Sequence, residues 1–168
     1  MKPFPALLIA LVFLVSGCGY KLGEIRPTPM RSVRTLSVPN FKNDTFESRV
    51  EVLFGDTVVK RLQQDGTYQL VNSSQADAIL SCTIANIRTN SLRSVINNVL
   101  ATSEFGLIVE VRYEVTHQGS GAILMQGTVL GNSSFFSGND LQTSKQQALS
   151  NAAFDLADKL TAQVAEGW

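Results

Sequence analysis

The sequence contains few of the residues that most often carry catalysis or hold metals. It has one histidine, His117, and two cysteines, Cys18 and Cys82, among 168 residues. A zinc site needs several His, Cys, Asp or Glu ligands at close spacing, and no such cluster occurs. A glycine-rich phosphate loop and a G-x-S-x-G nucleophile elbow are also missing. We therefore predict that the chain is not an enzyme and carries no cofactor or metal.

An excess of charge of either sign is also missing. The chain has 14 basic and 14 acidic residues, which cancel at neutral pH. Proteins that bind nucleic acid usually present a strongly basic surface, so this balance argues against a nucleic-acid partner. The chain is not depleted in apolar residues, because 44% of it is hydrophobic and it includes nine phenylalanines. We expect one ordered domain with a single core.

Long apolar segments are absent apart from one short run, from Ala6 to Val15, near the N-terminus. Ten residues cannot span a bilayer, which takes about 20 apolar residues, but they match the core of a secretory signal. Lys2 supplies the positive start, and the small residues Val15-Ser16-Gly17 precede Cys18. This pattern predicts a lipoprotein signal peptide over 1–17 and a lipid on Cys18, the only covalent group we expect.

The second cysteine has two possible roles. If Cys18 is acylated, Cys82 has no partner, and its apolar neighbours predict a buried side chain rather than a reactive thiol. If Cys18 stays unmodified, one disulfide could join the two. After the cysteine, glycines and prolines indicate a lipidated linker over 18–31. A single α/β domain is then expected over 32–168.

The hydrophobic pattern predicts two helices. After a capping-box pattern, Asp44-x-x-Glu47, apolar residues recur at helical spacing over 46–65, and Gly66 suits the position past a helix end. A second helix is predicted over 142–164. The residues expected in the core are Leu53, Phe54, Leu62, Val109, Val111, Leu156 and Leu160.

Strands are predicted between and around these helices, over 32–38, 68–71, 76–88, 104–116 and 122–134. In the 76–88 strand the apolar alternation slips near Ala85-Asn86, which indicates a bulge. The 104–116 strand alternates apolar and mostly charged residues, so one face of its sheet should stay uncovered. A strand–helix–strand unit should make its two strands parallel. We expect an α/β (α+β) two-layer sandwich, a mixed sheet of four to five strands with two helices on one face.

Candidate site residues are few. Glu110 and Glu114 share a strand face, but a solvated charged face explains them better than a catalytic pair. Arg88 and Arg93 flank the start of a predicted loop, Thr89–Leu100, and could contact anionic phosphates or simply be solvated. The apolar residues of this loop could contact a partner or fold back onto the sheet.

Several short segments together resemble the lipopolysaccharide-assembly lipoproteins, the LptE family. They are Cys18-Gly19-Tyr20, Val38-Pro39-Asn40-Phe41, Asn43-x-Thr45, Asp65-Gly66, Tyr68-x-Leu70-Val71, Ala76-Asp77-Ala78-Ile79-Leu80, the strand from Gly121 to Gly131, Ala148-x-x-x-Ala152-Ala153 and Glu166-Gly167-Trp168. The resemblance implies a non-catalytic protein that helps assemble and plug an LptD-type β-barrel, through which lipopolysaccharide reaches the cell surface. It implies lipidation at Cys18 and a place on the periplasmic face of the outer membrane. Gly19, rather than Asp, after the cysteine agrees with outer-membrane sorting in enterobacteria.

Two other classes stay open at this point. The Val33–Ile84 unit also resembles lipoprotein cofactors of other envelope machines, such as activators of cell-wall synthases and secretion lipoproteins. A small periplasmic enzyme is a third class, for which the sequence offers no site. The long hairpin over 101–136 and the closing helix favour lipopolysaccharide assembly.

Overall fold

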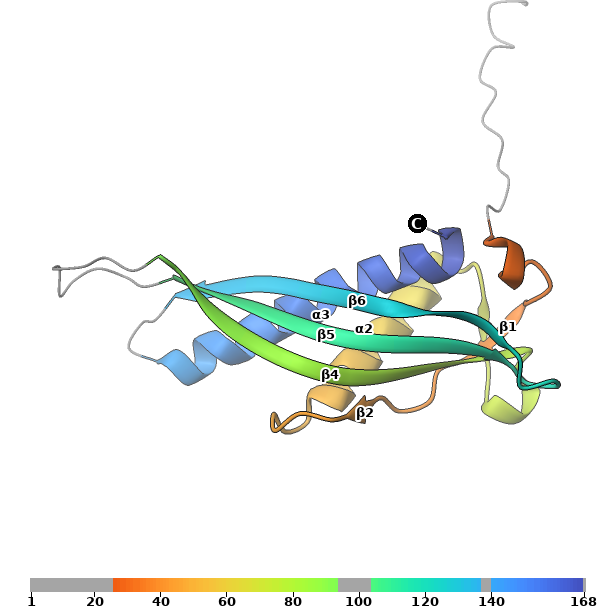
Figure 1. The fold of residues 1–168 in the computed structure, drawn as a ribbon, viewed down its shortest axis with the longest axis horizontal. Coiled ribbons are helices and arrows are strands. Elements are labelled where there is room, and N and C mark those ends of the chain that lie inside the picture. The colour runs from red at the N-terminus through yellow and green to blue at the C-terminus, as the bar shows by residue number, and fades with distance from the viewer. Residues whose placement is uncertain (1–25, 94–103, 137–139, 168) are drawn as a thin grey trace, which may run out of the picture.

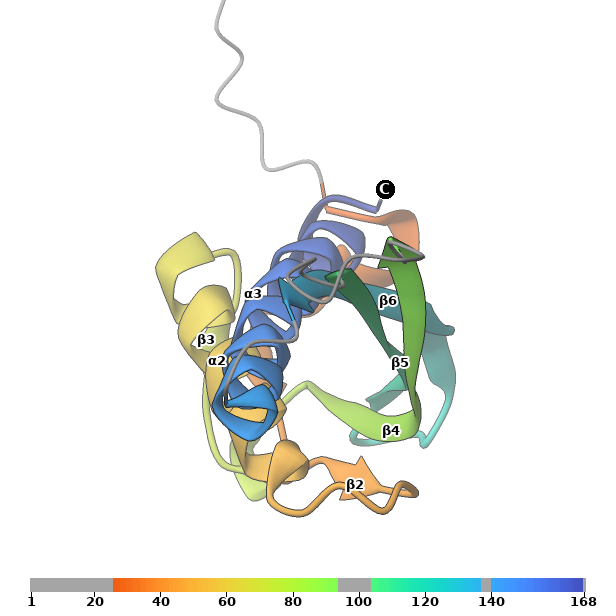
Figure 2. The same cartoon turned by 90° about the vertical axis from the view of Figure 1, so that its left-hand side faces the viewer.

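The computed structural model describes residues 26–93, 104–136 and 140–167. Two long helices, α2 (Val50–Asp65) and α3 (Leu141–Glu166), lie on the same side of a mixed sheet (Figures 1 and 2). The strands are β1 (Thr35–Ser37), β2 (Lys42–Asn43), β3 (Gln69–Leu70), β4 (Ala78–Arg93), β5 (Glu104–His117) and β6 (Ile123–Phe136). The predicted α+β two-layer architecture is confirmed, with six strands in place of four to five.

The sheet combines a short parallel part with a long antiparallel part. Its strand order is β3-β1-β4-β5-β6, and β2 pairs with β4 beside β1. The pairs of β1 with β3 and β4 are parallel, as the strand–helix–strand order predicts. The β4–β5 register shifts between Ile84 and Asn86, so the predicted bulge is confirmed.

The predicted ends of two strands, 76–88 and 122–134, are wrong. Residues 89–93, predicted as the start of a loop, continue β4 and pair with β5. Likewise, Phe135 and Phe136 belong to β6, and the Phe135 ring stacks on Phe105 with centroids 5.5 Å apart. Pairing with β5 extends both strands beyond their predicted ends. For β4, the residues Thr89–Arg93 are too polar for their alternation to be recognised from the sequence. The remainder of the predicted loop, residues 94–100, lies outside the described residues.

The first helix begins later than its capping pattern suggests. α2 starts at Val50, after Arg49 in a left-handed conformation, and no side chain caps it. Asp44 and Glu47 therefore do not form the predicted capping box. Instead the Asn43 Oδ1 atom accepts hydrogen bonds from the Thr45 backbone N–H and hydroxyl, at 2.9 and 2.7 Å. The other end is as predicted, with Gly66 at a φ of 74°.

The core lies between the helices and one face of the sheet. The side chains of Phe54, Leu62, Val109, Val111, Leu156 and Leu160 are all buried, as predicted. Leu53 is half-buried rather than buried, because the next residue along the helix, Phe54, takes the core position. Cys82 is buried as expected, and desolvation raises the pKa of its thiol to about 12.

The helix α3 follows the edge strand β6 closely. The Asp140 side chain caps its start by accepting a hydrogen bond from the Thr143 backbone N–H at 3.0 Å. Further along, a Cβ atom at Gly131 of β6 would collide with the carbonyl oxygen of Ala152. Glycine at this position therefore lets strand and helix backbones meet.

The packed part of the chain begins before residue 32. Residues Thr28–Met30 form a short 3-10 helix, η1, and the Met30 side chain is fully buried. Arg26 donates hydrogen bonds to the Val33 and Thr67 carbonyl oxygens and lies over the Tyr68 ring. The last six residues of the segment predicted as linker thus belong structurally to the domain.

Candidate functional site

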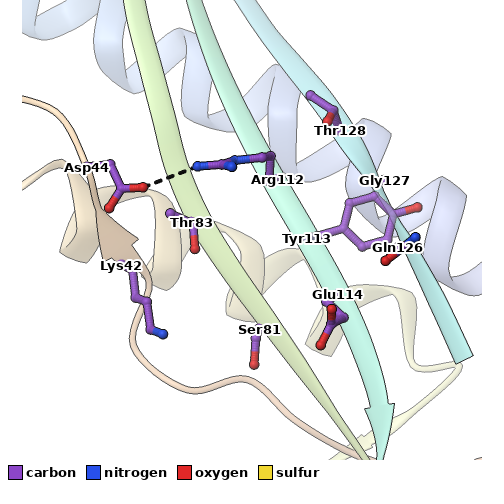
Figure 3. Close-up of a pocket in the computed structure, with 10 residues that line it drawn as sticks. All are labelled: Lys42, Asp44, Ser81, Thr83, Arg112, Tyr113, Glu114, Gln126, Gly127 and Thr128. Atoms are coloured by element: carbon purple, nitrogen blue, oxygen red, sulfur yellow. Dashed lines mark hydrogen bonds and ion pairs between the residues drawn. The ribbon is translucent and has the colours of Figure 1, made fainter. Parts of the chain in front are cut away.

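The face of the sheet that carries no helices holds a broad, open groove of about 790 Å³. Its lining side chains come from β2, β4, β5 and β6 and are mostly polar or charged (Figure 3). They are Lys42, Asp44, Ser81, Thr83, Arg112, Tyr113, Glu114, Gln126, Gly127 and Thr128. This arrangement confirms the prediction of an uncovered, polar sheet face.

An ion pair crosses the groove from one side to the centre. The Arg112 guanidinium on β5 lies 3.3 Å from the Asp44 carboxylate, which directly follows β2 (Figure 3). Asp44 is held there because its backbone N–H donates to the Ile84 carbonyl of β4 at 3.0 Å. Both side chains are more than half exposed. The pair therefore contributes little to stability and remains accessible to a polar partner.

Tyr113 and Gly127 form the β5–β6 side of the groove, directly opposite one another in the register. A Cβ atom at Gly127 would lie 2.9 Å from Tyr113 Cε1, so glycine makes room for the ring. The Tyr113 side chain is buried and packs with the core, on the same strand face as Val111, and this desolvation raises the pKa of its hydroxyl.

The two carboxylates Glu110 and Glu114 do not form a pair. They are four residues apart on an extended strand, which separates their Cα atoms by roughly 13 Å. Glu110 instead lies 3.8 Å from Arg88 across the β4–β5 pair. Glu114 lines the groove. The solvated, charged face is thus the interpretation that the structure supports.

The predicted phosphate contacts lie at one end of β4. Arg88 is 57% exposed and engaged with Glu110, so an anion would have to share it with a carboxylate. Arg93 is the last residue of β4, where its backbone pairs with Glu104. The Arg93 side chain and the whole of Cys18 lie outside what the structure describes.

The groove offers hydroxyl, amide, carboxylate and cationic groups, which suit hydrogen bonding to a polar surface. Within residues 26–93, 104–136 and 140–167, no three His, Cys, Asp or Glu side chains gather in a way that could hold a metal ion. Over those same ranges, no helix has the length and apolar character required to cross a membrane.

The sequence did not point to Lys42, Asp44 or Arg112 as members of a common surface. The sequence pattern indicates only a capping box at Asp44 and singles out neither Lys42 nor Arg112. The two-residue strand β2 brings the first two beside β4. A strand that short has no periodicity, so only its pairing reveals it.

Comparisons with known proteins give a family and a fold. The family model for lipopolysaccharide assembly, LptE, matches residues 33–164. No curated protein sequence matches the chain.

Solved structures that resemble the chain include three bacterial proteins of low sequence identity. A PelC dodecamer variant from Paraburkholderia phytofirmans is 16% identical with a TM-score of 0.53, covering 79% of this chain and 87% of that one. A minor lipoprotein from Acinetobacter baumannii is 16% identical with a TM-score of 0.53, and the match covers 79% of this chain and 92% of that one. A neuraminyllactose-binding hemagglutinin homolog from Helicobacter pylori is 10% identical with a TM-score of 0.56, and the match covers 86% of this chain and 90% of that one.

At such identities the structural matches establish the two-helix, mixed-sheet fold and nothing finer. The family match spans most of the domain, from the start of β1 to the last turn of α3. It agrees with the segments in the sequence that resemble this family. The chain belongs to the LptE lipopolysaccharide-assembly family.

Proposed function

We propose that this chain is a lipid-anchored protein of the outer membrane, on its periplasmic face, that helps assemble and plug an LptD-type β-barrel. It acts by binding, without catalysing a reaction, and supports transport of lipopolysaccharide to the cell surface. The family match over residues 33–164 is the observation that carries this proposal. Cys18 is the proposed lipidation site, since it follows a short apolar segment and small residues.

The polar face of the sheet gives the proposal a physical basis. The lumen of an outer-membrane barrel is polar, so a plug needs a rigid body with polar side chains on its outside. The groove around Arg112 presents such a surface on three long strands, with β5 paired to β4 on one side and to β6 on the other. The opposite face, covered by α2 and α3, keeps that surface rigid.

Arg88 and Arg93 are the proposed contacts to lipopolysaccharide phosphates. Guanidinium groups bind phosphate with two parallel hydrogen bonds, and the Arg88 side chain is exposed on β4. A phosphate would compete with Glu110 for Arg88. Because the proposed contact joins opposite charges at an exposed position, salt screens the attraction and should weaken the binding.

Capture of the tagged, lipidated protein from outer membranes tests the partner. Recovery of a large β-barrel supports the proposal, whereas recovery of a cell-wall synthase or a secretion channel supports the alternative role in another envelope machine. The double variant Arg88→Glu/Arg93→Glu should reduce lipopolysaccharide binding or barrel recovery. The matched control Arg31→Glu/Arg34→Glu reverses two exposed charges just before β1. It should leave lipopolysaccharide binding and barrel recovery unchanged.

Lipidation is tested separately, by labelling with a fatty-acid probe. The wild-type protein should be labelled and partition into detergent, while Cys18→Ala should be unlabelled. Labelling of Cys18→Ala, or an unlabelled wild-type protein, would contradict the assignment of the anchor.

A further inference from the structure

The Arg88–Glu110 and Arg112–Asp44 ion pairs, both on the uncovered face of the sheet, differ in how tightly the arginine is held. The Arg112 guanidinium donates a hydrogen bond to Asp44 at 3.3 Å (Figure 3). By contrast, Arg88 Nη2 lies 3.8 Å from Glu110 Oε2, which is beyond hydrogen-bond distance. The Arg88 guanidinium therefore feels the charge of the carboxylate, while its N–H groups are not bonded to it.

The strand register places Arg88 and Glu110 together. Glu110 and Arg112 are two residues apart on β5, so both point to the uncovered face. Arg88 of β4 is directly opposite Ile108, two residues before Glu110, which makes Arg88 and Glu110 diagonal neighbours. Diagonal side chains on one face have Cβ atoms roughly 7–8 Å apart, a separation that long charged side chains can bridge. Paired backbone, rather than a loop, thus fixes the position of both charges.

The Arg88–Glu110 pair is not needed to hold the fold together. The two side chains are 57% and 32% exposed, and ion pairs with such exposure contribute little to stability. Among the side chains that the structure describes, neither group takes part in a second ion pair, and the nearby Arg112 is engaged with Asp44. The Glu110 carboxylate therefore acts on Arg88 in particular, and it affects whatever else binds this guanidinium.

The chemistry of a guanidinium allows two anions to face Arg88 at once. The group has five N–H donors in one plane, and a phosphate needs only two parallel donors. A phosphate can therefore approach Arg88 without first breaking a hydrogen bond to Glu110. Once bound, it is repelled by the carboxylate, which is always present because it belongs to the paired strand. Glu110 thus permits the entry of a phosphate and favours its departure.

We propose that Glu110 is the release residue of the Arg88 site, because its carboxylate competes for the guanidinium and shortens the time that a phosphate stays bound. This inference rests on the proposed function, which supplies a lipopolysaccharide phosphate as the ligand of Arg88. A protein that passes a ligand onward needs contacts favourable enough to capture it and weak enough to let it leave, as ion channels do. An arginine without this carboxylate would hold the ligand longer.

The rate at which detergent-solubilised lipopolysaccharide dissociates from the mature, lipidated protein tests the proposal. Surface plasmon resonance at fixed salt concentration measures this rate. Glu110→Gln keeps the size and polarity of the side chain and removes its charge. It should slow dissociation by about 3- to 10-fold, the range expected for the loss of one repulsive charge close to the phosphate at an exposed position.

Glu114→Gln is the matched control. Glu114 lies on the same strand and the same face as Glu110, with roughly 13 Å between the Cα atoms. Both variants remove one negative charge, so both should raise the association rate to a similar, small extent through long-range attraction. Only Glu110→Gln should slow dissociation, since only Glu110 faces Arg88.

A double-mutant cycle shows whether the effect passes through the guanidinium. Arg88→Gln alone should speed dissociation, and Glu110→Gln added to it should change the rate by less than about twofold. Chemically dephosphorylated lipopolysaccharide is the matched ligand, and it should dissociate at the same rate from the wild type and from Glu110→Gln. Circular-dichroism melts should show that Arg88→Gln and Glu110→Gln fold like the wild type.

The outcomes separate this proposal from the proposed function. If Arg88→Gln leaves lipopolysaccharide binding unchanged, the assigned phosphate contact fails, and the release role fails with it. If Arg88→Gln weakens binding but Glu110→Gln does not slow dissociation, the release role alone is overturned. It is also overturned if Glu114→Gln slows dissociation as much, or if the slowing by Glu110→Gln persists without Arg88.

Discussion

The two faces of the sheet are built from the same three long strands but serve opposite purposes. On the helix-covered face, Leu107, Val109 and Val111 of β5 are completely buried. On the other face, Arg112 and Glu114 of the same strand line an open polar groove. Alternation along one strand therefore divides the domain into a face that maintains the fold and a face that is available to a partner.

The two faces should therefore respond differently to substitution. A side chain on the covered face contacts several elements, so its loss leaves a cavity. Ion pairs on the uncovered face compete with water, so their loss costs little. The following substitutions test this division, from the largest expected effect on stability to the smallest.

Phe54→Ala should have the largest effect. The Phe54 side chain is fully buried in the core, between α2 and the rest of the domain. Truncation should lower the free energy of unfolding by about 3–5 kcal/mol, because a cavity adds to the lost transfer free energy. Urea melts of the purified protein measure the change. A loss under about 1 kcal/mol would place Phe54 outside the core and contradict the comparison.

Gly131→Ala tests the approach of α3 to the edge strand β6. The added methyl would meet the Ala152 carbonyl and lie 2.9 Å from Leu156 Cβ. Forcing strand and helix apart should cost about 1–3 kcal/mol in thermal or urea melts. Gly119→Ala is the control, because a Cβ there would meet only the His117 ring, at 3.4 Å. Equal stability of the two variants would show that α3 can move without cost.

Asp77→Asn tests the junction of β1 and β4 and should cost about 1 kcal/mol at neutral pH. The Asp77 carboxylate accepts hydrogen bonds from the backbone N–H groups of Thr35 and Arg34, both at 2.9 Å, and these lower its pKa. The stability that the Asp77 carboxylate contributes is therefore fully present above its unfolded pKa of about 3.9. This stability is lost as the pH falls through the lower pKa of the folded state.

Melts of the wild type and Asp77→Asn across this acidic range provide the measurement. The difference in stability should be constant from neutral pH to about 5 and should shrink on further acidification. A difference that grows on acidification would show that the folded state raises this pKa, contrary to its hydrogen bonds.

Arg112→Gln on the uncovered face should have the smallest effect. Its partner Asp44 lies 3.3 Å away, but both side chains are more than half exposed. We expect a change of under about 0.5 kcal/mol in urea melts. A loss approaching that of Gly131→Ala would mean that the groove also holds the fold together, and the division between the two faces would fail.

Local sequence signals predicted the parts of the fold that have strong periodicity. The alternation of β5, the apolar stripe of α3 and the glycine at the end of α2 are readable because each depends on neighbours within a few residues. The same signals failed at the start of α2. There Asp44 and Glu47 match a capping box, but in the structure they pair with Arg112 and Lys145 from distant elements.

The candidate site was less predictable than the fold. An uncovered polar face followed from the charged positions of β5. The groove itself was not predicted, because Lys42 and Asp44 reach it through a strand of two residues.

The sequence by itself determined the family resemblance, the periodic elements and six of the seven residues predicted for the core, because burial follows from spacing along a helix or strand. Tertiary structure alone decided that β4 continues to Arg93, that β2 joins the sheet and that η1 packs onto the domain. Each of these depends on hydrogen bonds or contacts with segments far along the chain. Such pairings depend on the whole fold, which no short stretch of sequence contains.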